Sequence, residues 1–101
     1  MLAQARTARA GSDFAALSQA ADALLRLNPR EPRALVLKAD ALSGLGDPRA
    51  AMPFYGAALA QGRAVASPPP DMVQDLQRAA AAQAEGARRF EQGLRDGLMA
   101  R

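Results

Sequence analysis

The sequence predicts an all-α fold, and three features carry this prediction. Half of the 101 residues are hydrophobic while only 4% are aromatic, which is typical of helices that pack closely through small side chains. Apolar residues recur at helical spacing between a few breaks that contain proline or glycine. Aspartates and prolines stand at the positions where helices begin. The length fits one small domain, or a piece of a longer protein.

Two helices are expected early in the chain, over residues 13–27 and about 33–45, after a short helix that starts abruptly at residue 1. Asp13 stands at the start of the first of these two, where its carboxylate can accept hydrogen bonds from free backbone N–H groups. Prolines at 29 and 32 separate the two helices. Their apolar stripes are Phe14, Leu17, Ala21, Leu24 and Leu25 in the first, and Leu35, Ala39 and Leu42 in the second.

A third helix follows, with Asp47 as its cap and Pro48 at the favoured first position. Pro53 lies about six residues into it and removes one backbone hydrogen bond, which we interpret as a tolerated kink near the helix start. The aromatic residues of this helix fall on its apolar stripe, so we expect them in the core. That stripe is Ala51, Phe54, Tyr55, Ala58 and Leu59.

The last segment predicts one long helix over residues 70–99. Three prolines at 68–70 stop anything before it, and Asp71 is placed to cap it. Asp71 and Asp75 lie near the positive end of the helix dipole, which explains them better than acid/base catalysis does. The apolar residues keep near-heptad spacing for almost the whole length. They are Val73, Leu76, Ala80, Ala87, Phe90, Leu94 and Leu98.

The chain contains a repeat. Asp13 and Asp47 lie 34 residues apart, and each starts a helix directly after a glycine-containing turn. This is the period of the tetratricopeptide repeat, and the second copy resembles that family's pattern. The resemblance implies a right-handed superhelix of about two helix pairs, residues 1–31 and 32–66, with a capping helix at 70–99, all in one domain of residues 1–101. It is carried by Leu35, Ala39, Leu42, Gly46-Asp47, Ala51, Tyr55 and Ala58, where Leu35 and Leu42 replace the family's usual aromatics and Lys38 its usual leucine.

A narrower resemblance covers nearly the full chain. It is carried by the run from Asp22 through Asn28-Pro29, Gly46-Asp47, Phe54-Tyr55 and Pro68–Asp71 to the helix with Arg89-Phe90-Glu91. The run is similar to the N-terminal repeat region of bacterial aspartyl/asparaginyl β-hydroxylase-like proteins, which depend on iron and 2-oxoglutarate. In that family the iron-binding histidines lie in a following domain. This chain has no histidine, so the resemblance implies an accessory domain without catalytic residues.

The tetratricopeptide resemblance also implies a groove, lined by the first helix of each pair, that receives extended peptides. The residues opposite the stripe of residues 35, 39 and 42 are therefore expected to face outward. The family's carboxylate clamp is not supplied, because Val36 and Asp40 stand where hydrogen-bond donors are needed. A merely solvated face is the alternative interpretation. The candidate groove residues are Arg6, Arg9, Arg33, Val36, Asp40 and Ser43.

The charge of the chain is basic but dispersed. Thirteen basic and ten acidic residues give a net charge of +3, yet residues 68–101 hold five of each. Because no basic tract exists, we do not expect nucleic-acid binding. A free-standing basic module that binds an acidic partner or nucleic acid remains the alternative.

Much chemistry is excluded by composition. Without cysteine or histidine the chain cannot build a histidine-based triad or a zinc site on those ligands, and no phosphate-loop motif follows Gly44-Leu45-Gly46. We therefore expect no enzyme, no cofactor and no metal. No secretory signal or membrane-spanning run is predicted, so the cytoplasm is the expected location. The predicted function is a non-catalytic scaffold that contacts a protein or a neighbouring domain, with pairing of two copies left open.

Overall fold

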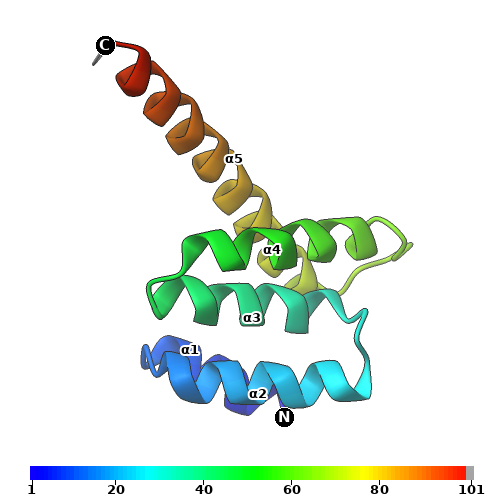
Figure 1. The fold of residues 1–101 in the computed structure, drawn as a ribbon. Helices are drawn as coiled ribbons and strands as arrows, with labels where there is room; N and C mark the ends of the chain where they lie inside the picture. The colour runs from blue at the N-terminus through cyan, green and yellow to red at the C-terminus, as the bar shows by residue number, and fades with distance from the viewer. Residues whose placement is uncertain (100–101) are drawn as a thin grey trace.

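The all-α prediction is confirmed. The computed structural model describes residues 1–99, except for the side chains of residues 98 and 99, and these residues form five helices and no strand. The helices begin and end within about a residue or two of the predicted positions. They are α1 (Leu2–Ala10), α2 (Phe14–Leu27), α3 (Pro32–Gly44), α4 (Pro48–Gly62) and α5 (Pro70–Met99) (Figure 1).

Two turns of the chain have the same backbone design. In the turns at residues 11–13 and 45–47, the middle residue has a left-handed φ, 55° at Ser12 and 92° at Gly46. The following aspartate donates its N–H to a carbonyl five residues back over 2.9 Å in both turns. Its carboxylate then accepts from the N–H three residues ahead, at 3.2 Å for Asp13 and 3.1 Å for Asp47. The predicted caps are confirmed, and the turns repeat at an offset of 34 residues.

Helix α3 is the centre of the fold. Each helix packs on the next along the chain, and α3 also contacts α1 and α5 (Figure 1). One apolar cluster joins α3 to α4 and α5, and a second joins α3 to α1 and α2. The first contains Leu35, Val36, Ala39, Ala51, Tyr55, Ala58 and Ala79, and the second contains Ala5, Leu17, Ala21, Leu37 and Ala41.

Helix α5 starts two positions earlier than a cap at Asp71 would require. Pro70 is its first residue, and the carbonyl of Pro69 accepts from the N–H of Val73 at 3.0 Å. Asp71 thus lies inside the first turn, so the prediction that it caps the helix is wrong. The third proline takes the first position because its fixed φ suits a helix start and it has no N–H to satisfy.

Only the first half of α5 covers the bundle, and the second half projects away from it (Figure 1). The helix packs closely as far as Gly86: a Cβ added to Gly62 would lie 2.6 Å from Leu76, and one added to Gly86 would lie 3.0 Å from Met52. The buried face consists of Met72, Asp75 and Ala79. Of the apolar residues with near-heptad spacing, Ala80, Ala87, Phe90 and Leu94 are exposed, and the side chain of Leu98 lies outside the described residues.

Within the described part of the chain, no helix combines the length and apolar character needed to cross a membrane.

Candidate functional site

Charged side chains from α1, α3 and α5 meet in one network, which we call the interhelix network. Asp75 is its most buried member, with 1% of its side chain exposed. Its carboxylate accepts from Arg6 at 3.0 and 2.7 Å and from Arg78 at 2.8 Å. Arg6 lies on α1, and Asp75 and Arg78 lie on α5. Because the backbones of α1 and α5 do not pack together in the described structure, Arg6 links these two helices.

Asp40 on α3 is the second acceptor of the interhelix network. Its carboxylate, 11% exposed, accepts from Arg9 at 3.0 Å and from Arg78 at 2.8 Å. The hydroxyl of Tyr55 on α4 donates to its other oxygen at 2.7 Å. Arg78 therefore bridges Asp40 and Asp75, which extends the network across four helices. Its Nε is buried without a hydrogen-bond partner among the described residues.

Asp71 completes the network at the start of α5. It accepts from Arg6 at 3.1 Å and from Arg33 at 3.2 Å, and Arg33 is also paired with Glu31. Four arginines thus face four carboxylates, which leaves the network without net charge. Such pairing compensates the cost of removing charged groups from water, and it fixes the relative positions of the helices.

The surroundings change the acidity of several members. Burial, reinforced by the hydrogen bond to Asp40, raises the pKa of Tyr55 to about 12. The hydrogen bond to Asp75 raises the pKa of Arg6 despite partial desolvation. For Asp71, desolvation acts upward, but the hydrogen bonds from Arg33 and Arg6 lower its pKa overall. These directions favour a protonated tyrosine and charged ion pairs near neutral pH.

The structure brings together four of the six predicted groove residues, but it turns them toward other helices. Arg6, Arg9, Arg33 and Asp40 all belong to the interhelix network, and three of them bind residues of α5. Sequence reasoning missed Asp71, Asp75 and Arg78 as their partners. A possible signal was the spacing of 38 residues shared by Arg33 with Asp71 and by Asp40 with Arg78, which pairs opposite charges.

The expectation that Val36 faces outward is wrong. Its side chain is fully buried, in the cluster that joins α3 to α4 and α5. The reason is that α3 has neighbours on several sides, so that seven of its residues are buried and it has no broad outward face. Ser43, the sixth predicted residue, lies at the end of α3 and lines two cavities.

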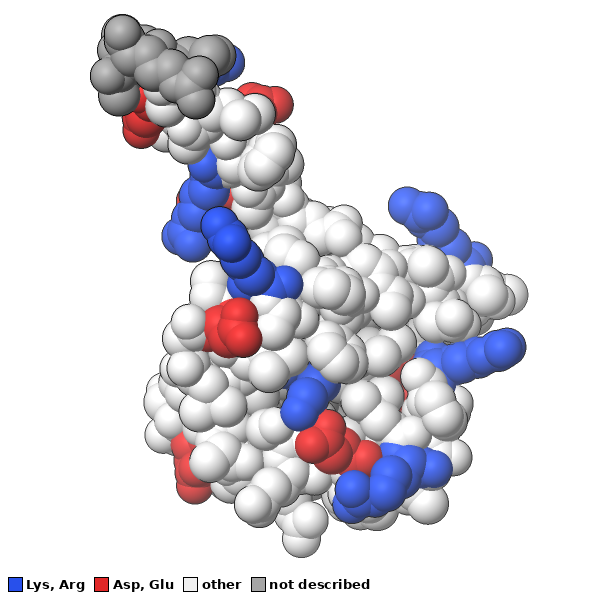
Figure 2. Space-filling model, in the orientation of Figure 1, with Lys and Arg blue, Asp and Glu red and all other residues white. Residues whose placement is uncertain are grey.

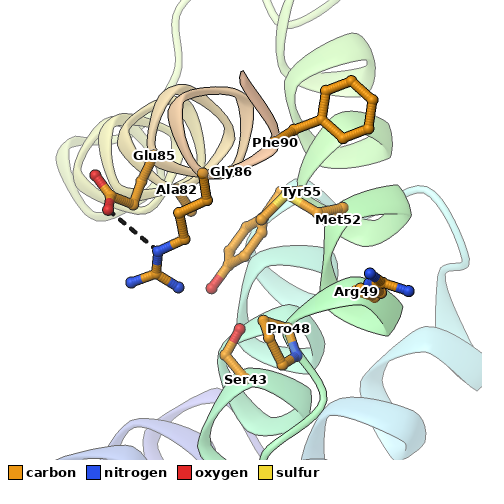
Figure 3. Close-up of a pocket in the computed structure, with 10 residues that line it drawn as sticks. Ser43, Pro48, Arg49, Met52, Tyr55, Ala82, Glu85, Gly86 and Phe90 are labelled. Atoms are coloured by element: carbon orange, nitrogen blue, oxygen red, sulfur yellow. Dashed lines mark hydrogen bonds and ion pairs between the residues drawn. The ribbon is translucent and has the colours of Figure 1, made fainter. Parts of the chain in front are cut away.

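The larger cavity has a volume of about 540 Å³ and lies between α4 and α5 (Figure 3). Met52 and the ring of Tyr55 line it from α4, and Ala82 and Gly86 from α5, so its inner surface is mainly apolar. Charged residues stand on opposite sides of it, as Figure 3 shows for Arg49 and Glu85. The full lining is Ser43, Pro48, Arg49, Met52, Tyr55, Ala82, Glu85, Gly86, Arg89 and Phe90.

A second cavity of about 520 Å³ adjoins the first, because both are lined by Ser43 and Tyr55. It extends toward α1 and α2 and is more polar, with the Arg9–Asp40 pair in its wall. Its lining is Arg9, Ala10, Ser12, Phe14, Asp40, Ser43, Gly44 and Tyr55. We call the two cavities together the central groove.

The acidic group of the more polar cavity is already engaged in hydrogen bonds. No group of three or more acidic, histidine or cysteine side chains in the described residues could hold a metal ion. The carboxylate of Asp40 is already occupied by three donors, so it is poorly placed to act as a base. On the face drawn in Figure 2, basic side chains gather where the projecting part of α5 leaves the bundle. The central groove thus has a mainly apolar floor and a partly basic rim.

Comparison with protein-family models, curated proteins and solved structures gives no match for this chain.

Proposed function

We propose that this chain is a non-catalytic helical-repeat scaffold of the tetratricopeptide type that binds a partner protein, or a neighbouring domain, through the central groove. The observation that carries the proposal is the pair of equivalent turns at residues 11–13 and 45–47. They share hydrogen bonds, capping and a left-handed middle residue at an offset of 34 residues. Repeated helix pairs of this length build extended surfaces for protein contact.

The interhelix network supports the same proposal, because it makes the groove walls rigid. Asp40 and Tyr55, which line the groove, are fixed by hydrogen bonds to each other and to Arg78. A preorganised surface loses less conformational entropy on binding than a flexible one. The scaffold thus has a shaped, partly apolar groove rather than a set of reactive groups.

The network also argues against the alternative of a free-standing basic module. Arg6, Arg9, Arg33 and Arg78 are all paired with carboxylates in the described structure. A phosphate backbone would have to displace these intramolecular pairs before it could use the arginines. Where the partner is a domain of the same protein, the resemblance described above would make it an iron-dependent hydroxylase domain.

The proposal is tested by capture of partners from the source cells with matched charge variants. The exposed Arg49 on the groove rim is changed to glutamate, and Arg26, exposed on α2 and outside the groove, is changed in the same way as the control. The wild type and Arg26→Glu should retain the same protein, whereas Arg49→Glu should retain much less of it. Equal retention by both variants would remove the central groove from the proposal.

A further inference from the structure

The rim of the cavity between α4 and α5 holds a basic residue that has no ion pair in the described structure. Three charged residues line this cavity, and they are Arg49, Glu85 and Arg89. The side chain of Arg49 is exposed, and none of the ion pairs within the described part of the chain includes it. Its guanidinium group is therefore available to a carboxylate from another molecule.

The opposite side of the cavity carries an excess of one positive charge. The carboxylate of Glu85 accepts hydrogen bonds from Arg88 at 2.8 Å and from Arg89 at 3.2 Å. One carboxylate between two guanidinium groups leaves this cluster with a net charge of +1. Because Glu85 can keep Arg88 as its partner, Arg89, which lines the cavity, can turn to a second carboxylate. Figure 3 shows this side of the cavity across from Arg49.

No second carboxylate from the described residues lines this cavity. Asp47 precedes α4, but its carboxylate caps that helix and is not part of the lining. Asp96 lies about two turns beyond Arg89, accepts a hydrogen bond from Gln92 at 3.0 Å, and is also outside the lining. The two positive sides of the cavity are therefore complementary to negative charge on a partner.

The floor between these charges can admit a large apolar side chain. The cavity volume of about 540 Å³ lies within the range of about 300–1,000 Å³ that is usual for ligand pockets. Gly86 keeps the floor open, because a Cβ at this position would lie 3.0 Å from the terminal methyl group of Met52. Met52 is flexible and adapts to a bound group, and the exposed ring of Phe90 extends the apolar wall.

We propose that the partner binds the central groove through an acidic segment. One bulky apolar side chain of this segment enters the cavity between α4 and α5, and carboxylates on either side of it pair with Arg49 and Arg89. The apolar side chain is the buried anchor, while the carboxylates select and orient the segment. The paired carboxylates belong to side chains, so the segment does not have to be a chain terminus. This inference rests on the proposed function and adds the chemistry of the partner.

The chemistry of the segment is tested by selection from a library of random linear peptides displayed on phage, with the purified chain as bait. The selected peptides should share one bulky apolar residue with aspartate or glutamate on both sides of it. Their binding should weaken as the salt concentration rises, because salt screens exposed charges. Selected peptides without an excess of acidic residues would overturn the inference, as would the absence of any selected peptide.

Charge variants then locate the carboxylates of a selected peptide. Arg49→Glu and Arg89→Glu should each raise the peptide dissociation constant by about fivefold in fluorescence anisotropy. The matched controls are Arg26→Glu on α2 and Arg95→Glu on α5, which change exposed arginines outside the cavity. At physiological salt these controls should change the constant by less than about twofold. Losses as large in the controls would show that only the net charge of the chain matters, which would overturn the inference.

A pair of glycine variants tests the entry of the apolar side chain. Gly86→Leu fills the cavity by displacing the flexible end of Met52, and it should weaken peptide binding by about tenfold or more. Gly93→Leu is the control, because a Cβ at Gly93 meets no atom within 4 Å and Gly93 is outside the lining. Both changes replace glycine within a helix, so neither should lower the melting temperature. Unchanged binding by Gly86→Leu would overturn the inference.

The outcomes separate this inference from the proposed function. Selected peptides that are not acidic, but that Gly86→Leu still excludes, would end the inference and leave the central groove as a binding site. Peptides that bind equally to the wild type, Gly86→Leu and Arg49→Glu would remove the central groove from both.

Discussion

Asp40 and Asp75 show how this small core holds carboxylates away from water. Each accepts hydrogen bonds from at least two side chains, and together they join α1, α3, α4 and α5. None of these contacts was predicted from the sequence, because they depend on how far α5 is rotated and shifted against α3. The sequence does place Tyr55 correctly in the core, since its position on an apolar stripe determines its burial.

Tyr55 provides a direct optical test of this environment. It is the only tyrosine, and the chain has no tryptophan, so ultraviolet absorbance of tyrosinate reports this residue alone. The native protein should titrate with a midpoint of about 12. The unfolded chain in urea should titrate near the ordinary value of about 10.

The same shift predicts a change in stability at high pH. Because folding raises the pKa of Tyr55, the stability it contributes is complete below about pH 10 and is lost as the pH rises toward 12. Tyr55→Phe should remove this part of the pH dependence. A native midpoint near 10 would contradict the buried hydrogen bond to Asp40.

Asp75→Ala tests the buried end of the interhelix network. The change leaves Arg6 and Arg78 without their shared acceptor. Because each is about one-third exposed, the loss of unfolding free energy should be smaller than the roughly 3–5 kcal/mol typical of a broken buried pair, about 2–3 kcal/mol. The matched control is Glu85→Ala, which removes an exposed acceptor of Arg88 and Arg89. Urea unfolding should show no measurable change for this control.

The helices themselves could be predicted well from the sequence, while the packing of α5 could not. Asp13 and Asp47 identify two helix starts because a carboxylate there satisfies free N–H groups, a purely local effect. The apolar spacing of α5 is a poor guide to burial, because it continues past the bundle at Phe90 and Leu94 and because Ala80 lies beside the buried face of Met72, Asp75 and Ala79. Periodicity shows which residues share a face, but only tertiary structure shows whether a neighbour covers that face.

The two equivalent turns predict how substitutions at their middle residues, Ser12 and Gly46, change the stability of the protein. Ser12 has a left-handed φ of 55° where Gly46 has 92°, and a residue with a Cβ is strained in that region. Ser12→Gly should therefore raise the unfolding free energy by about 1 kcal/mol, and Gly46→Ser should lower it by a similar amount. Thermal unfolding of the two variants checks this, and a loss of stability in Ser12→Gly or a gain in Gly46→Ser would contradict it.

At the scale of the whole molecule, α5 divides into a bound half and a projecting half, which accounts for the extents of 50 × 31 × 20 Å. The bound half is attached to α1 through ion pairs, and to α3 through both ion pairs and the apolar cluster that contains Ala79. Arg33–Asp71 and Asp40–Arg78 share one sequence separation of 38 residues. An equal separation at two points means that α3 and α5 run in the same direction. The first helices of successive pairs have this relation in a helical repeat.

Acid should weaken this attachment. Arg33 and Arg6 lower the pKa of Asp71 in the folded state, despite opposing desolvation. The stability from Asp71 is therefore complete above the unfolded pKa of about 4 and is lost as the pH falls through the lower folded value. Urea unfolding from about pH 6 to about pH 3, a range that spans the unfolded pKa, should show a falling free energy of unfolding. Asp71→Asn should reduce the slope of this fall with pH. A slope unchanged in Asp71→Asn would place the acid sensitivity elsewhere.

The most direct test of the central groove as a partner site is photo-crosslinking in the source cells. A photoreactive amino acid is placed at Arg49 on the groove rim, and at Arg26 on α2 in a separate control. Position 49 should crosslink to one distinct protein or neighbouring domain, and position 26 should not. Equal crosslinking at both positions, or none at position 49, would contradict the account of this chain as a scaffold that binds through its groove.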